Sequence, residues 1–71
     1  MKNQIPDVDI KALRKKLGLT QREFAEKYHL SFQVVRSWEQ LEKKPSGAAK
    51  LLLFLIDKIP QAIGNELEKL S

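Results

Sequence analysis

The stretch from Thr20 to Glu39, TQREFAEKYHLSFQVVRSWE, constrains the fold of this chain more than any other part. Thr20 and Glu23 make a capping-box pattern, in which the hydroxyl and the carboxylate each bond a free backbone N–H at a helix start. Ser31, a second N-cap residue, follows only three positions after Tyr28, the last apolar residue of the first helix. The sequence therefore predicts two short helices joined by a tight turn.

The rest of the chain predicts three more helices and no strand. Ile10, Leu13 and Leu17 have helical spacing ahead of Gly18, with Asp7 or Asp9 as the cap. A leucine-rich helix follows Ser46, and Pro60 begins the last helix. We therefore expect an all-α, compact five-helix fold. One domain would span residues 1–71, with a loose arm over 1–8, a helix-turn-helix over 20–40 and C-terminal helices over 46–70.

Composition excludes several classes of function. The 71 residues include no cysteine and a single histidine, His29, so neither a disulfide nor a metal site is expected. No nucleophile has an evident base beside it, and phosphate-binding glycine loops are missing, so we expect no cofactor and no enzyme activity. Apolar runs are too short for a membrane span, and the N-terminus lacks a signal pattern. We expect a cytoplasmic protein.

Positive charge is concentrated around the helical pair. The chain carries a net charge of +4, but residues 10–50 hold ten Lys and Arg against four Asp and Glu. A surface that faces phosphates needs such a distribution, although basic surfaces also serve solubility alone.

The second helix of the pair has a polar face that is not needed to form the hydrophobic core. Val35 and Trp38, spaced three apart, should be buried. The side chains that then face outward are Phe32, Gln33, Arg36 and Ser37. A steeply crossing second helix fits the DNA major groove, where Gln pairs with adenine, Arg with guanine, and an apolar group with the thymine methyl. The alternative is that these residues form an ordinary solvated face.

Residues 20–45 resemble the helix-turn-helix of Xre or Cro/C1-type repressors, which have a lambda-repressor-like fold. The similarity covers Thr20-Gln21, Glu23-Phe24-Ala25, Leu30-Ser31, Val35 and Trp38-Glu39, followed by a basic loop ending in Pro45. It implies that DNA is read by the four outward residues. It also implies DNA-backbone contacts from Gln21, Arg22, Lys43 and Lys44, and an ion pair between Arg14 and Glu39.

The sequence departs from that family at two positions. His29 stands where glycine is usual, so we expect the same turn with a positive φ and some strain. Leu41 also stands where glycine is frequent, so the helix that starts at Phe32 should extend to about residue 41 or leave by a different loop.

The C-terminal part, LEKKPSGAAKLLLFLIDKIPQAI, resembles the end of HigA-like antitoxins. This resemblance implies a homodimer that represses its own operon at palindromic DNA and binds a RelE- or HigB-like toxin. The alternatives are a phage-type repressor without a toxin, and an interaction module whose main role is to bind a toxin.

The helix after Ser46 is apolar almost all round, and Phe54 shares a stripe with Lys50, Asp57 and Lys58. Either the bundle covers this helix on every side, or a second copy covers part of it. For the second case, the expected dimer-interface residues are Phe54, Leu53, Ile63 and Leu67.

Overall fold

Each helix begins at a residue suited to a helix start. In the computed structural model, which describes residues 5–70, the Thr20 hydroxyl accepts from the Glu23 N–H at 3.0 Å, and the Glu23 carboxylate accepts from the Thr20 N–H at 2.9 Å. Asp9 is the aspartate that caps the first helix. The helices are α1 (Ile10–Lys16), α2 (Gln21–Lys27), α3 (Phe32–Glu39), α4 (Gly47–Lys58) and α5 (Pro60–Glu68). The five predicted helices are confirmed, and residues 5–70 contain no strand.

The first three helices end in the same way, with a left-handed residue shortly after the last helical turn. These residues are Gly18 with φ 72°, His29 with φ 57° and Leu41 with φ 62°. In each case the next backbone N–H donates back into the helix: Leu19 to the Arg14 carbonyl, Leu30 to that of Ala25, and Glu42 to that of Ser37. The positive φ predicted for His29 is confirmed. The prediction that α3 extends to about residue 41 is wrong: α3 ends at Glu39, and Leu41 takes a left-handed conformation in the turn that follows.

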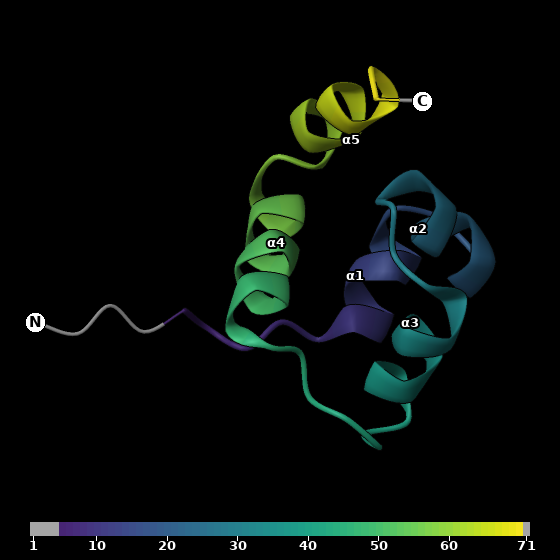
Figure 1. The fold of residues 1–71 in the computed structure, drawn as a ribbon, viewed down its shortest axis with the longest axis vertical. Helices are drawn as coiled ribbons and strands as arrows, with labels where there is room; N and C mark the ends of the chain where they lie inside the picture. Colours follow the sequence, from purple (N-terminus) through teal and green to yellow (C-terminus); the bar gives the residue numbers. More distant parts are fainter. Residues whose placement is uncertain (1–4, 71) are drawn as a thin grey trace, which may run out of the picture.

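One core joins the helices. α1 and α2 both pack on α3, while α5 packs on α2 and α4. Figure 1 shows α1, α2 and α3 grouped together, with α4 alongside this group and α5 at the far end of α4. The buried side chains are Ile10, Leu13, Phe24, Ala25, Tyr28, Val35, Trp38, Leu53 and Ile56. Val35 and Trp38 therefore face inward, as the spacing predicted.

A buried glycine of α5, Gly64, faces Lys27 and Tyr28 at the end of α2. A Cβ atom on Gly64 would lie 2.9 Å from the Cε atom of Lys27 and 3.9 Å from the ring of Tyr28. The Tyr28 hydroxyl also donates to the Pro60 carbonyl at 3.4 Å. Gly64 thus lowers helix propensity, while the Tyr28–Pro60 bond joins α5 to the helix-turn-helix.

The N-terminal segment is only partly covered by the structure. Of the arm predicted over residues 1–8, residues 1–4 lie outside the described part of the chain. Residues 5–9 are not helical. Val8 packs against the core and Asp7 pairs with Lys50 at 2.9 Å, so this half of the expected arm is attached rather than loose.

The residues expected to form a dimer interface on α4 and α5 differ in how much of their surface is accessible. Leu53 is only 1% exposed and belongs to the chain's own core, so it has no surface left for a partner. Ile63 and Leu67 also pack against this core, and Phe54 is half-buried with the Lys58 ammonium 5.7 Å from its ring centre. Conversely, Leu51 is 45% and Ile59 47% exposed. The bundle therefore does not cover α4 on every side: Phe54 stays partly accessible, and Leu51 and Ile59 are more open still.

Candidate nucleic-acid interface

The turn between α2 and α3 fixes how the second helix is presented. After α2 ends, the backbone reverses through His29, whose N–H lies 3.4 Å from the Glu26 carbonyl. Leu30 then closes the turn with a 2.8 Å bond to the Ala25 carbonyl, and the Ser31 hydroxyl caps α3. A histidine at φ 57° thus forms a turn for which glycine is the residue of lowest steric cost.

Burial of one side of α3 determines what the other side presents. Val35 and Trp38 are in the core. Gln33 and Arg36 are exposed, whereas Phe32 and Ser37 are half-buried. The four residues expected to read bases are therefore all at least partly accessible, and the two with the strongest hydrogen-bonding capacity are the most open.

A hydrogen-bonded network fixes the C-terminal end of α3 to α1 and α2. The Arg14 guanidinium donates to both Glu39 oxygens, from Nε at 2.7 Å and from Nη2 at 3.0 Å. Its Nη1 donates to the Leu19 carbonyl at 3.1 Å. The ion pair expected between Arg14 and Glu39 is therefore present, in the bidentate geometry that guanidinium and carboxylate favour.

Gln21 contributes to the same network. Its amide Nε2 donates to Glu39 Oε1 at 3.0 Å. The resemblance implied a phosphate contact for Gln21; one of its two amide hydrogens is already used inside the protein, which leaves the other for DNA. No sequence signal pointed to this bond, because Gln21 and Glu39 are brought together only by the crossing of α2 and α3.

The network shifts the ionisation of both charged partners. Hydrogen bonds from Arg14 hold the pKa of the Glu39 carboxyl below its usual value of 4.5; burial opposes this shift, and the Gln21 bond adds to it. The hydrogen bond to Glu39 correspondingly raises the pKa of Arg14. Glu39 is therefore a carboxylate at neutral pH, and α3 is held by a charged pair.

A second cluster lies at the N-terminal end of α3. The Arg22 guanidinium carbon, from α2, is 4.5 Å from the centre of the Phe32 ring, and that of Arg36 is 5.9 Å from the same point. Both distances are in the range of cation–π contact. Two cations from different helices therefore gather around one aromatic ring on the accessible side.

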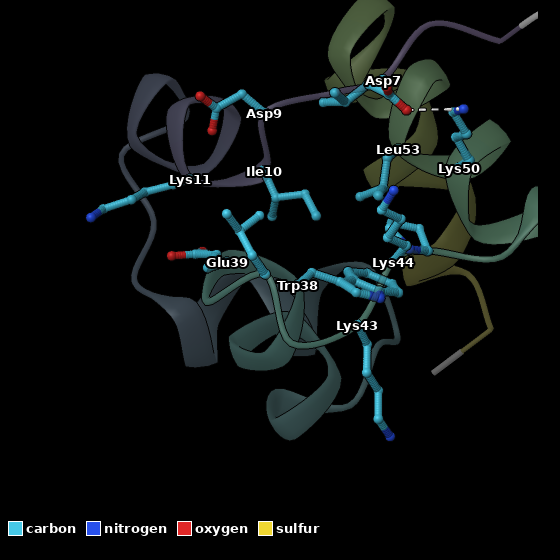
Figure 2. A pocket seen from close by; sticks show the side chains of 13 residues that line it. Asp7, Asp9, Ile10, Lys11, Trp38, Glu39, Lys43, Lys44, Lys50 and Leu53 are labelled. Atoms are coloured by element: carbon cyan, nitrogen blue, oxygen red, sulfur yellow. Dashed lines mark ion pairs between the residues drawn. The ribbon is translucent and has the colours of Figure 1, made fainter.

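The loop after α3 separates the two lysines that were expected on the DNA backbone. A cavity of about 660 Å³ lies between this loop, the start of α1 and the start of α4. Figure 2 shows Lys44 reaching toward Lys50 and Asp7, whereas Lys43 points away from the cavity. Hydrogen bonding and charge from Lys50 lower the pKa of Asp7, and the charge of Lys44 adds to this effect. Lys43 is thus the lysine that projects freely.

A comparison with protein families matches residues 10–49 to the helix-turn-helix family. The chain belongs to the helix-turn-helix family of DNA-binding regulators, of the Xre and Cro/C1 type. The matched residues extend from the first residue of α1 into the first turn of α4, so they include the Arg14–Glu39 network, the α2–α3 turn and the loop after α3. Searches of curated proteins and of solved structures found no match.

Two further observations concern residues 5–70 as a whole. No helix in this part of the chain has the length and apolar character needed to cross a membrane. Within the same residues, no three His, Cys, Asp or Glu side chains lie close enough to hold a metal ion.

Proposed function

We propose that this chain is a sequence-specific transcriptional regulator that binds palindromic operator DNA as a homodimer, with α3 in the major groove. The observation that carries this proposal is the way α3 is held. Its inward side is buried, its C-terminal end is fixed by Arg14, Gln21 and Glu39, and its outward side keeps Gln33 and Arg36 exposed. A rigid helix with free bidentate donors suits base readout.

In this proposal, Gln33 and Arg36 discriminate bases, and Ser37 and Phe32 flank them on the outward side of α3. Lys43 and the remaining amide hydrogen of Gln21 supply backbone contacts that set the register. The basic character of residues 10–50 adds the long-range attraction that non-specific DNA binding requires.

Selection of bound sequences from random duplex DNA tests the proposal. The expected result is a twofold-symmetric motif whose half-sites are centred about 34 Å apart, one turn of the duplex. A single unpaired motif would contradict the homodimer, and failure to enrich any motif would contradict sequence-specific readout.

The proposed dimer uses the open side of α4. Ala48, Leu51, Leu55 and Ile59 share one side of this helix, and none of them carries a charge. The charged residues Lys50 and Asp57 lie on another side, where they pair with Asp7 and Lys16. Lys58, exposed and seven residues after Leu51, lies beside this stripe, so two copies avoid placing like charges in contact where Ala48, Leu51 and Leu55 form the interface.

Light scattering on the parent and on Leu51→Asp tests this surface. Because Leu51 is 45% exposed, an aspartate there should leave the fold intact and convert a dimer to a monomer. Leu41→Asp, at an 89% exposed leucine on the α3–α4 loop, is the matched control and should remain dimeric. A monomeric parent, or a dimeric Leu51→Asp, would contradict the proposed interface.

The antitoxin role is a finer proposal supported by the sequence resemblance of residues 41–63 to HigA-like proteins. The family match ends at Ala49 and so does not reach most of that segment. A small toxin gene beside this one, whose product co-purifies with this chain, is the expected observation. Operator binding without such a neighbour would favour the phage-type repressor instead.

A further inference from the structure

Phe32 occupies an unusual place on the outward side of α3. It is the first residue of the helix, and it is partly buried against the hydrophobic core. The rest of the ring has Arg22 at 4.5 Å and Arg36 at 5.9 Å from its centre. A ring with two cations beside it has less surface left to offer a thymine methyl.

The two arginines are held by this ring rather than by acids. Within residues 5–70, neither Arg22 nor Arg36 takes part in an ion pair or a side-chain hydrogen bond. Glu26 lies four residues after Arg22, a spacing that permits an ion pair on a helix, yet the guanidinium turns to Phe32 instead. A guanidinium that contacts a ring in this way is oriented while all of its N–H donors stay free.

We propose that Phe32 is a positioning residue for DNA recognition, which acts through Arg22 and Arg36 and does not itself read a base. This inference rests on the proposed function. The aromatic ring orients one arginine from α2 and one from α3 before DNA arrives, so less side-chain entropy is lost on binding. Arg22 thereby becomes part of the same recognition unit as Arg36.

Geometry limits the reach of this unit. Since both guanidinium carbons are measured to one ring centre, they lie within about 10 Å of each other. Successive base pairs are spaced by about 3.4 Å, so the two arginines address positions within about three steps along the duplex. Loss of the ring should therefore disturb a short, continuous part of the half-site.

Three substitutions separate positioning from direct contact. Phe32→Leu keeps an apolar side chain that can fill the core and touch a thymine methyl, but it has no π face. Phe32→Tyr keeps the π face. The double variant Arg22→Ala/Arg36→Ala removes both cations and leaves the ring. Arg22→Ala and Arg36→Ala are also made singly, and the double-arginine variant is combined with Phe32→Leu; thermal unfolding confirms that every protein tested is folded.

The measurement is the dissociation constant for the selected duplex and for a set of single-base-pair variants of it. We expect Phe32→Leu to weaken binding about 2- to 30-fold, the range of a cation–π contact, and to relax the base pairs that Arg22→Ala or Arg36→Ala relaxes. Phe32→Tyr should restore the parent's values. In the Arg22→Ala/Arg36→Ala background, Phe32→Leu should change affinity by less than about 2-fold, because the interaction it removes is already gone.

Two results would overturn the inference. One is an effect of Phe32→Leu that is undiminished in the double-arginine background. The other is a loss of preference at a separate A·T pair on Phe32→Tyr or Phe32→Ala, which would make the ring a direct reader of thymine. Failure of the proposed function is distinguishable, since the parent itself would then show no preference among the duplexes.

Discussion

Glu39 accepts hydrogen bonds from Arg14 through both of its carboxylate oxygens, across 25 residues of sequence, at the point where α1, α2 and α3 meet. The side chains are only 4% and 13% exposed, respectively, so the pair is largely removed from water. This pair sets the position of α3 relative to α1 and the rest of the fold.

Removal of Arg14 should be costly. In Arg14→Ala, the Glu39 carboxylate stays in its desolvated place with Gln21 as its remaining side-chain donor. We expect a loss of about 2–4 kcal/mol in the free energy of unfolding, measured in urea. Arg14→Lys should recover only part of it, because an ammonium cannot make the bidentate contact. Lys15→Ala, an exposed change in the same helix, is the control and should stay within about 0.5 kcal/mol of the parent.

The same pair predicts how stability depends on pH. The pKa of Glu39 is lower in the folded chain than its ordinary value of 4.5. The contribution of ionised Glu39 to the free energy of unfolding is therefore complete above pH 4.5 and is lost as the pH falls through the pKa of the folded state. Unfolding free energies of the parent and of Glu39→Gln, measured from neutral to acidic pH, should converge in this range. Parallel curves would show that Glu39 gives no such contribution.

Leu41 and Gly18 both have a positive φ, so a change to glycine at the first and to alanine at the second should affect stability in opposite directions. Leu41 has φ 62° and is 89% exposed, so Leu41→Gly removes backbone strain and little packing. We expect a gain of about 0.5–1 kcal/mol. Gly18 has φ 72° and no atom near the place of a Cβ, so Gly18→Ala should lose about 1 kcal/mol through the backbone alone. The midpoint temperature of thermal unfolding should rise in Leu41→Gly and fall in Gly18→Ala. Shifts in the same direction would contradict the role given to the backbone conformation.

Lys43 and Lys44 should differ in their effect on DNA affinity. Lys43 projects from the loop, whereas Lys44 reaches toward Asp7 at the cavity (Figure 2). Lys43→Ala should weaken binding to all duplexes alike and reduce the slope of log affinity against log salt by about 1. Lys44→Ala should reduce the slope less. Equal reductions would mean that Lys44 leaves the cavity when DNA binds.

Helix starts could be predicted from the sequence because each has a local chemical cause. Thr20 with Glu23, Ser31, Ser46 and Pro60 act on backbone groups within one turn. Helix ends were less predictable. Leu41 takes a conformation that its side chain disfavours, because the Glu42 N–H bonds back to Ser37 and the chain must turn there.

Side-chain contacts between helices could be predicted only where the resemblance to a known family implied them. The Arg14–Glu39 pair came from the resemblance, whereas the Gln21–Glu39 bond and the Arg22–Phe32 contact depend on the crossing of α2 and α3. The burial of Leu53 was missed for another reason. In a helix apolar nearly all round, periodicity cannot say which side meets the core, and Leu53, rather than Leu51, proved to be inside.

The central claim is that the outward side of α3 reads DNA sequence. The most direct test is the ratio of dissociation constants for random and selected duplexes, measured for the parent and for Gln33→Ala/Arg36→Ala. A control double variant, Lys15→Ala/Gln61→Ala, also changes one cation and one amide, at exposed positions on α1 and α5. We predict that the outward-side variant lowers the ratio at least about 10-fold, since each bidentate pair gives about 1–3 kcal/mol of discrimination, while the control keeps it. An unchanged ratio in Gln33→Ala/Arg36→Ala would contradict the account.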